Sequence, residues 1–421
     1  MFSALLEDPA EDGAQILVSR SGKKIHFEAE DLSKPEKKEE FFSRWKKILH
    51  PVADISDPSA IRCLVYAAYE AGCLIENLPK PKSRLAGPVL WLHFPEWSCR
   101  YLPEKEEIHI NLFSAAAEAE PKLDFIEARL REKSLLAPAK KPSVGKIKAT
   151  EPAAYKSAVL NAKKYIRAGD IFQANIARFW SVEADESIGP ALYASLRKVN
   201  PAPFSAYMDI ESKYGRIQII SASPERLFHL STDGVVNTRP IAGTRKRGVG
   251  RRDEELGSEL LLSEKERAEH TMLVDLERND LGRVCQPGTV EVNESMSIER
   301  YATVQHIVSN VRGVLSEKTD AVDVFRAMFP GGTITGCPKV RCMQLIHELE
   351  GQARGPYTGS AGYINWDGSA DMNILIRTFW LYQGRLHWAA GAGIVADSSP
   401  EFELREAGYK ADGLLRALEL Q

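Results

Sequence analysis

Residues 391–410 read GAGIVADSSPEFELREAGYK, the pattern of a strand that passes through a turn into a helix. The apolar run at 386–390 just before it predicts the strand. Ser399 is a residue type that caps helices and Pro400 suits a first helical position, so we expect a helix from about 400 to 419. Glu403 and Glu406 would then lie on one face of that helix.

The chain before this stretch mixes strands and helices in the same way. Pro152 is predicted to open a helix that ends at Gly169-Asp170. Further helices are expected at about 189–199, 252–273, 320–329 and 338–350, and strands at 171–182, 217–220, 363–364 and 375–382. Because no regular βαβ period connects them, the pattern favours an α+β fold over a Rossmann or barrel plan.

Composition sets the broad class of the protein. The 421 residues carry a net charge of −3 and are 44% hydrophobic, which is ordinary for a globular protein and gives no reason to expect nucleic acid or an anionic membrane as a partner. No apolar run is long enough to span a membrane, and the six cysteines form no CxxC pair. We therefore expect a cytoplasmic protein without a disulfide framework or a zinc site.

Three regions follow from local composition. Residues 1–135 are strand-like and irregular, 136–150 (LAPAKKPSVGKIKAT) have the Pro, Lys and small residues of a linker, and 151–421 carry the strongest patterns. We expect the third region to be the catalytic domain.

A second carboxylate cluster lies at residues 263–270, SEKERAEH. Ser263 and Glu266 have the spacing of a capping box, and Glu266 and Glu269 would share one helix face. Two helices that each offer a Glu-x-x-Glu pair could hold a hard cation between them. A solvated, charged helix face explains each segment equally well by itself.

Two glycine-rich loops and one histidine complete the candidates. Residues 239–248 (RPIAGTRKRG) and 330–339 (PGGTITGCPK) would let backbone N–H groups approach an anion, although the spacing is not that of a P-loop. Each loop by itself is equally compatible with a tight turn. His306 is an isolated polar residue in an apolar run, the pattern of a core histidine or of an acid–base group.

Taken together, these segments resemble the chorismate-utilising enzymes, the family of anthranilate synthase component I and aminodeoxychorismate synthase component I. The resemblance is strong from about residue 151 to 418 and looser before it. It rests on the stretches RPIAGTRKRG, KERAEHTMLVDLERNDLGRV, VQHIVSNVRG, PGGTITGCPKVRCMQLIHELEG, GPYTGSAGYI, NILIRT and GAGIVADSSPEFELREAGYKA. It implies the family's two-lobed sandwich of antiparallel sheets with helices packed outside, and a site that binds chorismate.

The resemblance also implies a role for each matching carboxylate. Glu269 and Glu406 match Mg²⁺ ligands with Glu403 close by, and the metal would bind the substrate's ring carboxylate and help the C4 hydroxyl to leave. Glu266 matches the general base or acid for the addition of ammonia.

The remaining site residues are implied in the same way. Tyr357 and Arg377 match residues that hold the enolpyruvyl carboxylate, a planar anion that suits a guanidinium fork. His306 matches a histidine tied to the leaving group or to pyruvate elimination. The other implied contacts to substrate are Thr244, Thr333, Gly393 and Lys410.

The branch of the family decides which ring carbon is aminated. Ala242 stands where the enzymes that make aminodeoxychorismate carry a lysine, and with Thr333 it favours anthranilate synthase of the tryptophan pathway. Residues 173–176 (QANI) and 200–207 (NPAPFSAY), and the short N-terminus, favour aminodeoxychorismate synthase of the folate pathway. On balance we expect aminodeoxychorismate (para-aminobenzoate) synthase component I, with anthranilate synthase component I as the alternative.

Other functions fit less well. Isochorismate and salicylate synthases share the fold but use a lysine to activate water, where this chain has Gln173. A regulatory protein with a dead site would lack one of the matched residues, and a di-iron oxidase would need paired Glu-x-x-His motifs. No glutaminase motif is visible, so we expect ammonia from a separate glutamine amidotransferase, in a heterodimer or heterotetramer.

Overall fold

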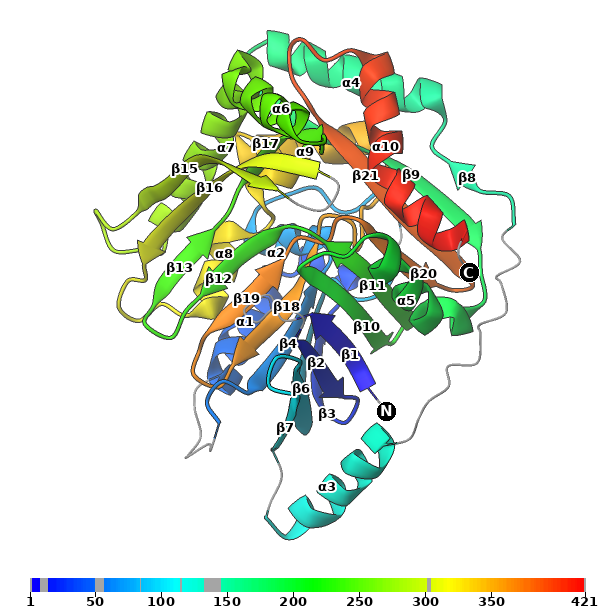
Figure 1. The fold of residues 1–421 in the computed structure, drawn as a ribbon, viewed down its shortest axis with the longest axis vertical. Helices are drawn as coiled ribbons and strands as arrows, with labels where there is room; N and C mark the ends of the chain where they lie inside the picture. The colour runs from blue at the N-terminus through cyan, green and yellow to red at the C-terminus, as the bar shows by residue number, and fades with distance from the viewer. Residues whose placement is uncertain are drawn as a thin grey trace.

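The computed structural model describes residues 2–7, 14–49, 57–83, 85–113, 116–131, 145–300 and 304–419. Two large antiparallel sheets form its centre, and helices cover them (Figure 1). The prediction of an α+β fold with two antiparallel sheets is confirmed. No helix in these ranges is long and apolar enough to cross a membrane.

The first sheet has eleven strands. Their spatial order is β17 (Gly336–Cys337), β9 (Gln173–Glu183), β21 (Arg385–Ile394), β20 (Thr378–Tyr382), β11 (Gly215–Ser223), β10 (Phe204–Ser212), β1 (Phe2–Glu7), β2 (Gln15–Ser19), β6 (Trp97–Leu102) and β7 (Glu107–Leu112), with β8 (Lys148–Ala149) paired to β9. Strands from both ends of the chain therefore belong to one sheet.

The second sheet has ten strands. Their order is β14 (Ile241–Lys246), β16 (Val304–Val314), β13 (Val235–Thr238), β12 (Arg226–Leu230), β19 (Ala370–Asn373), β18 (Ser360–Asn365), β4 (Ile61–Ala67), β5 (Leu90–Pro95) and β3 (Gly22–Phe27), with β15 (Glu291–Arg300) paired to β16. The N-terminal region thus supplies strands to both sheets. The predicted boundaries at 135 and 150 remain predictions, because 132–144 lie outside the described residues.

The helices are α1 (Pro35–Leu49), α2 (Gly72–Ile75), α3 (Ala116–Arg131), α4 (Pro152–Arg167), α5 (Gly189–Val199), α6 (Arg251–Leu262), α7 (Glu264–Gly282), α8 (Ala321–Met328), α9 (Lys339–Glu350) and α10 (Pro400–Glu419). Short 3₁₀ turns are η1 (Ala29–Ser33), η2 (Tyr69–Ala71), η3 (Glu186–Ile188) and η4 (Gly332–Ile334). Helix α10 packs on β21 and contacts α4 and α5 (Figure 1).

Apolar burial holds the two sheets together. One cluster joins residues from the facing strands of both sheets, among them Ile219 and Trp380 from the first and Leu64 and Tyr363 from the second. A larger cluster lies beneath the covering helices and includes fully buried Trp45 and Trp388. Because burial of apolar surface is the main favourable term in folding, these two layers fix how the sheets stack.

Two predicted elements differ from the structure. The helix expected over 252–273 is two helices, because Ser263 adopts an extended conformation between them and its hydroxyl accepts a hydrogen bond from the Glu266 backbone N–H at 3.3 Å. The strand expected from Leu375 begins only at Thr378, because Arg377 has a positive φ of 52° that interrupts an extended chain. The second break lies at Arg377, which belongs to the candidate site.

Candidate active site

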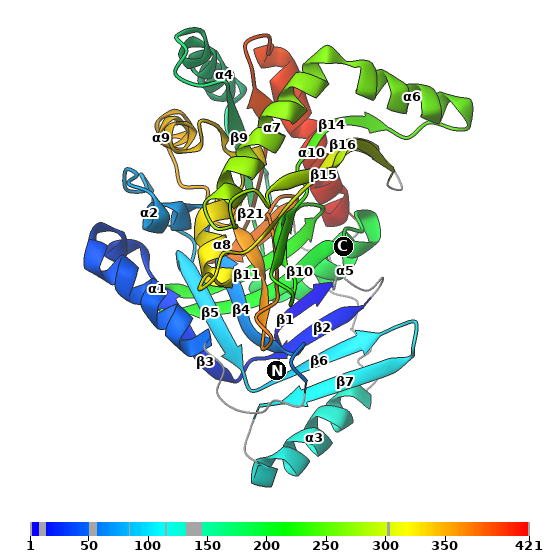
Figure 2. The same cartoon turned by 90° about the vertical axis from the view of Figure 1, so that its left-hand side faces the viewer.

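Segments from distant parts of the chain meet at one end of the first sheet. Helix α7 packs beside β14 and β16, and α10 crosses β21 (Figure 2). The short strand β17, which follows the glycine-rich loop, pairs with the start of β9. The carboxylates of α7, the glycine loop and the end of β21 are thereby placed close together.

Glu269 on α7 faces the first sheet. Its Oε1 accepts a hydrogen bond from Gln173 Nε2 at 3.1 Å. A Cβ atom added to Gly393 would lie 2.4 Å from that Nε2 and 3.3 Å from the Glu269 oxygen. A side chain at 393 would therefore displace the amide of Gln173 and press on the Glu269 carboxylate. The structure places Glu269 and Gly393, two of the candidate site residues, next to each other, and it adds Gln173.

Glu266, one turn earlier, lies against β14. Its Oε2 would be 2.8 Å from a Cβ atom on Gly243, and its Oε1 is 3.4 Å from Arg245 Nη1. His306 meets the same glycine from β16, since its Nδ1 lies 3.3 Å from the Gly243 carbonyl oxygen. The two predicted acid–base residues thus flank one backbone segment.

The environment of His306 decides its charge. The side chain is 6% exposed, and burial lowers the pKa of the imidazole to about 4. The ring is therefore neutral at pH 7. Because a carbonyl oxygen only accepts, Nδ1 carries the proton and Nε2 is left as an acceptor. His306 at neutral pH can accept a proton or a hydrogen bond but brings no positive charge.

Glu225, which the sequence analysis missed, supplies a buried carboxyl group between β11 and β12. Thr333 Oγ1 donates a hydrogen bond to Glu225 Oε1 at 2.6 Å. Burial raises the pKa of this carboxyl to about 7, against the opposing effects of that hydrogen bond and the positive charges of Arg377 and Lys410. An acid set between two apolar strands, in the stretch SASPERLF (221–228), was the signal that could have revealed it.

Arg377 and Lys410 are brought close to this acid. Their charges act on both Glu225 and His306, so the guanidinium and ammonium groups lie near both side chains. Lys410 Nζ also donates to the Gly391 carbonyl at 3.0 Å and pairs with Glu406 Oε1 at 2.8 Å. This corner of the site holds two cations, one neutral imidazole and one carboxyl group that titrates near neutral pH.

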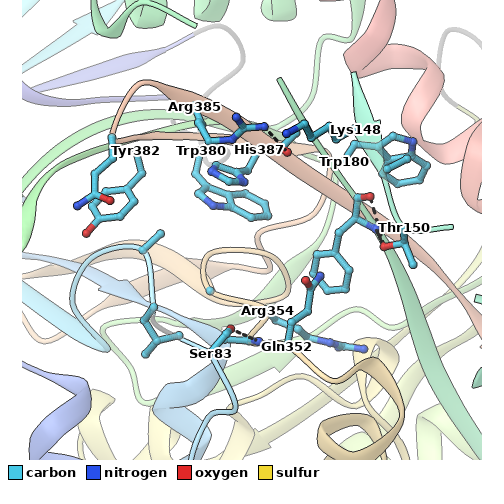
Figure 3. Close-up of a pocket in the computed structure, with 18 residues that line it drawn as sticks. Ser83, Lys148, Thr150, Trp180, Gln352, Arg354, Trp380, Tyr382, Arg385 and His387 are labelled. Atoms are coloured by element: carbon cyan, nitrogen blue, oxygen red, sulfur yellow. Dashed lines mark hydrogen bonds between the residues drawn. The ribbon is translucent and has the colours of Figure 1, made fainter. Parts of the chain in front are cut away.

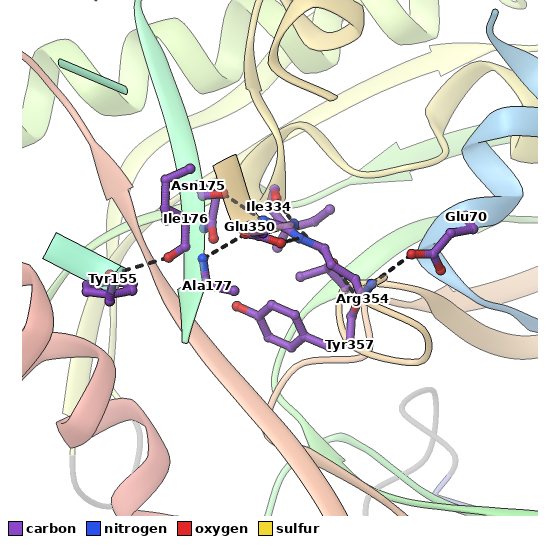
Figure 4. Close-up of polar contacts among 10 residues, drawn as sticks. Glu70, Tyr155, Asn175, Ile176, Ala177, Ile334, Glu350, Arg354 and Tyr357 are labelled. Carbon is purple, nitrogen blue, oxygen red and sulfur yellow. Dashed lines mark hydrogen bonds and ion pairs between the residues drawn. The ribbon is translucent and has the colours of Figure 1, made fainter. Parts of the chain in front are cut away.

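Tyr357 belongs to a buried network centred on Arg354 (Figure 4). The Arg354 guanidinium lies 5.6 Å from the Tyr357 ring centroid and donates to the Asn175 carbonyl at 2.7 Å and the Ile334 carbonyl at 3.0 Å. Glu350 pairs with it, and both side chains are 1% exposed. The network ties the loop of Tyr357 to β9 and to the glycine loop, two segments that frame the site.

The predicted metal ligands are only partly assembled. Glu403 is buried and its charge acts on Tyr155 of α4, whereas Glu406 pairs with Lys410 and Glu269 with Gln173. Within the described ranges, no group of three or more His, Cys, Asp and Glu side chains is arranged to hold a metal ion. Carboxylates suit Mg²⁺ chemically, and Mg²⁺ is commonly held by one or two carboxylates while water and substrate oxygens complete its shell.

Two predicted residues contribute through the backbone of β14. Ala242 is 6% exposed and pairs in register with Ile307. Thr244 pairs in register with His306, while its side chain lies outside the described residues. The lysine-free position of β14 therefore pairs with Ile307, the residue that follows His306 in β16.

Comparisons with known proteins identify the family of this chain. A family model described as chorismate binding enzyme matches residues 3–416. An anthranilate synthase component I-like protein of Synechocystis is 45% identical over 85% of this chain and 72% of its own length. Aminodeoxychorismate synthase component 1 of Bacillus subtilis is 49% identical over 63% of this chain and 56% of its own length.

A solved structure extends the likeness to the whole fold. Anthranilate synthase component I from Streptococcus pneumoniae superposes with a TM-score of 0.80 and 29% identity, over 98% of this chain and 90% of that one. The fold is thus the anthranilate synthase component I-like arrangement of two antiparallel sheets with helices. With the family model matching residues 3–416 and the solved structure superposing over 98% of the chain, the chain belongs to the chorismate-binding enzyme family.

Proposed function

We propose that this chain is the large subunit of an anthranilate synthase, which adds ammonia to C2 of chorismate and releases pyruvate and water. The observation that carries this product is Ala242, a buried residue of β14 that pairs with Ile307, at the position where the C4-aminating branch has a lysine. Alanine at this position lacks the side-chain amine that adds to C2 in the C4-aminating branch, which favours direct addition of ammonia at C2. This reverses the product favoured from the sequence and agrees with the anthranilate names of the Synechocystis and Streptococcus proteins.

Glu225 is the proposed proton donor to the leaving C4 hydroxyl. A pKa of about 7 leaves much of this carboxyl protonated at neutral pH, as a general acid requires. Thr333 fixes its orientation through the 2.6 Å hydrogen bond. Arg377 and Lys410 nearby suit the two carboxylates of chorismate, and Tyr357 would complete the enolpyruvyl side of the pocket.

Glu266 and His306 are the proposed groups for proton transfers at C2. Glu266 lies beside Gly243 and can take a proton from the incoming ammonia. The neutral His306 can accept a hydrogen bond or a proton through Nε2 as the ring becomes aromatic and pyruvate leaves. Glu269 and Glu406 would hold Mg²⁺, which when bound would neutralise the ring carboxylate.

The partner is part of the same proposal. Ammonia would come from a separate glutamine amidotransferase subunit in a cytoplasmic heterodimer or heterotetramer, since the family names denote component I of two-component enzymes.

Aminodeoxychorismate synthase is retained as a second candidate. Gln173 and its neighbours match that branch, and the Bacillus subtilis relative bears that name. Product analysis distinguishes the two candidate activities. We expect the chain with chorismate, Mg²⁺ and ammonium to release anthranilate and pyruvate. Para-aminobenzoate that appears only after addition of aminodeoxychorismate lyase would instead establish amination at C4.

A further inference from the structure

A cavity of about 600 Å³ lies between the first sheet and two loops, and none of the candidate site residues lines it (Figure 3). Its roof is formed by β9, β20 and β21, and its floor by Ser83, Leu85, Ala86 and residues 352–355. The two floor loops are joined by a hydrogen bond from the Ala353 N–H to Ser83 Oγ at 2.9 Å. A volume of this size is typical of pockets that bind small molecules.

One row of side chains crosses the roof. Lys148 on β8 pairs in register with Ser181 on β9, Ser181 with His387 on β21, and His387 with Trp380 on β20. Residues that pair directly across a sheet lie on the same face, so a cation, a hydroxyl, an imidazole and an indole follow one another across the cavity. The imidazole and indole are stacked, with centroids 5.6 Å apart and planes at 9°.

The cavity is positive at one end. Arg385, two residues before His387 on β21, donates to Ser181 Oγ at 3.1 Å, which brings its guanidinium to the position that Lys148 faces (Figure 3). Lys148 has no ion pair within the described ranges. Among the residues that the structure describes, the only ion-pair partner of Arg385 is the exposed Glu183, whose Oε1 lies 3.4 Å from Arg385 Nη1. None of the described residues that line the cavity is acidic, although the whole chain is negative.

The other walls are apolar and aromatic. Phe179 on β9 and Tyr382 on β20 lie two residues from Ser181 and Trp380, and therefore on the same face of the sheet. Burial lowers the pKa of His387 to about 4, so the stacked pair is neutral at physiological pH and presents flat rings. A ligand that fits these walls is flat, aromatic and anionic at one end.

We propose that this cavity binds a planar aromatic carboxylate, with its ring against Trp380 and His387 and its carboxylate between Lys148 and Arg385. The site is distinct from the candidate active site, and the inference does not depend on the proposed reaction. The floor residue Arg354 also holds β9 and the glycine loop through its guanidinium. A bound ligand would therefore touch the loop that supports the active site.

The test uses 2-naphthoate as the probe and the full chain, with binding measured by calorimetry. We expect saturable binding, weakened at least tenfold in the Lys148→Gln/Arg385→Gln double variant. Both side chains lie at the cavity rim, so the fold should persist. The uncharged 2-naphthamide should bind this variant and the wild type equally. Trp380→Phe keeps an aromatic ring of smaller size. It should weaken the binding of 2-naphthoate by less than the double variant does.

Two controls separate this cavity from the active site. Arg377→Gln should bind 2-naphthoate as the wild type does, and Arg131→Gln, at an exposed position on α3, should change nothing. Loss of binding in Arg377→Gln with normal binding in the double variant would place the probe in the active site and overturn the proposal. Absence of saturable binding to the wild type would also overturn it. Failure to form anthranilate would bear only on the proposed function.

Discussion

Replacement of Glu225 by glutamine should stabilise the protein at alkaline pH while it disables the enzyme. The carboxyl is fully buried, and its pKa is raised from 4.5 to about 7. Since each tenfold change in protonation corresponds to about 1.4 kcal/mol, ionised Glu225 costs roughly 3 kcal/mol of folding free energy.

The sign of the pH dependence follows from the raised pKa. A carboxyl whose pKa is higher in the folded protein contributes its full stability below pH 4.5, and this contribution is lost as pH rises through about 7. Glutamine is never ionised. Glu225→Gln should therefore unfold like the wild type near pH 4.5 and be more stable by roughly 2–3 kcal/mol at pH 8.

Activity should change in the opposite direction. Loss of a general acid typically lowers kcat by roughly 10²- to 10⁴-fold. The wild-type rate should also fall as pH rises above about 7, when Glu225 loses its proton, and this alkaline limb should be absent from the residual rate of the variant.

Denaturant unfolding at pH 4.5 and pH 8, together with kcat against pH, tests both parts. Glu104→Gln, at an exposed turn position, is the matched control and should change neither stability nor rate. Near-normal kcat with the alkaline limb retained would refute Glu225 as the proton donor. Equal stability of the variant and the wild type at pH 8 would refute the free-energy cost assigned to burying the ionised Glu225 carboxylate.

Three further predictions rest on single contacts. Gly393→Ala should lower kcat/KM at least tenfold with little change in Tm, because the new methyl group displaces flexible side-chain ends. Gly408→Ala, whose Cβ would meet nothing within 4 Å, is the control for steady-state kinetics and melting. Glu269→Gln should abolish Mg²⁺-dependent turnover while circular dichroism shows an intact fold, and full activity would remove the metal assignment. Arg354→Met should lower the free energy of unfolding by about 3–5 kcal/mol, because Glu350 is left buried without its partner, and a smaller loss in urea titration would show that the pair is weakly coupled.

Elements with strong local signals were predictable. Pro152 and Pro400 begin the helices α4 and α10 as expected, because proline is favoured in the first turn of a helix and disrupts the interior of one. The paired carboxylates of α7 and α10 also followed from helical spacing alone. The break at Ser263 was harder to place, since the Leu, Glu, Lys and Arg residues on both sides of it are strong helix formers that also suit one continuous helix.

The sequence by itself determined which residue types are present for chemistry: carboxylates at three-residue spacing, small residues in the glycine loop, and alanine in place of lysine at 242. Only the tertiary structure decided which of them meet. Glu225 and Thr333 are 108 positions apart, and their contact exists because β11 and the glycine loop converge at one end of the first sheet. The pKa of Glu225 likewise depends on burial by the whole fold, and the row from Lys148 to Trp380 depends on strand register. Local sequence sets dihedral preference and spacing, whereas burial and long-range pairing are properties of the assembled chain.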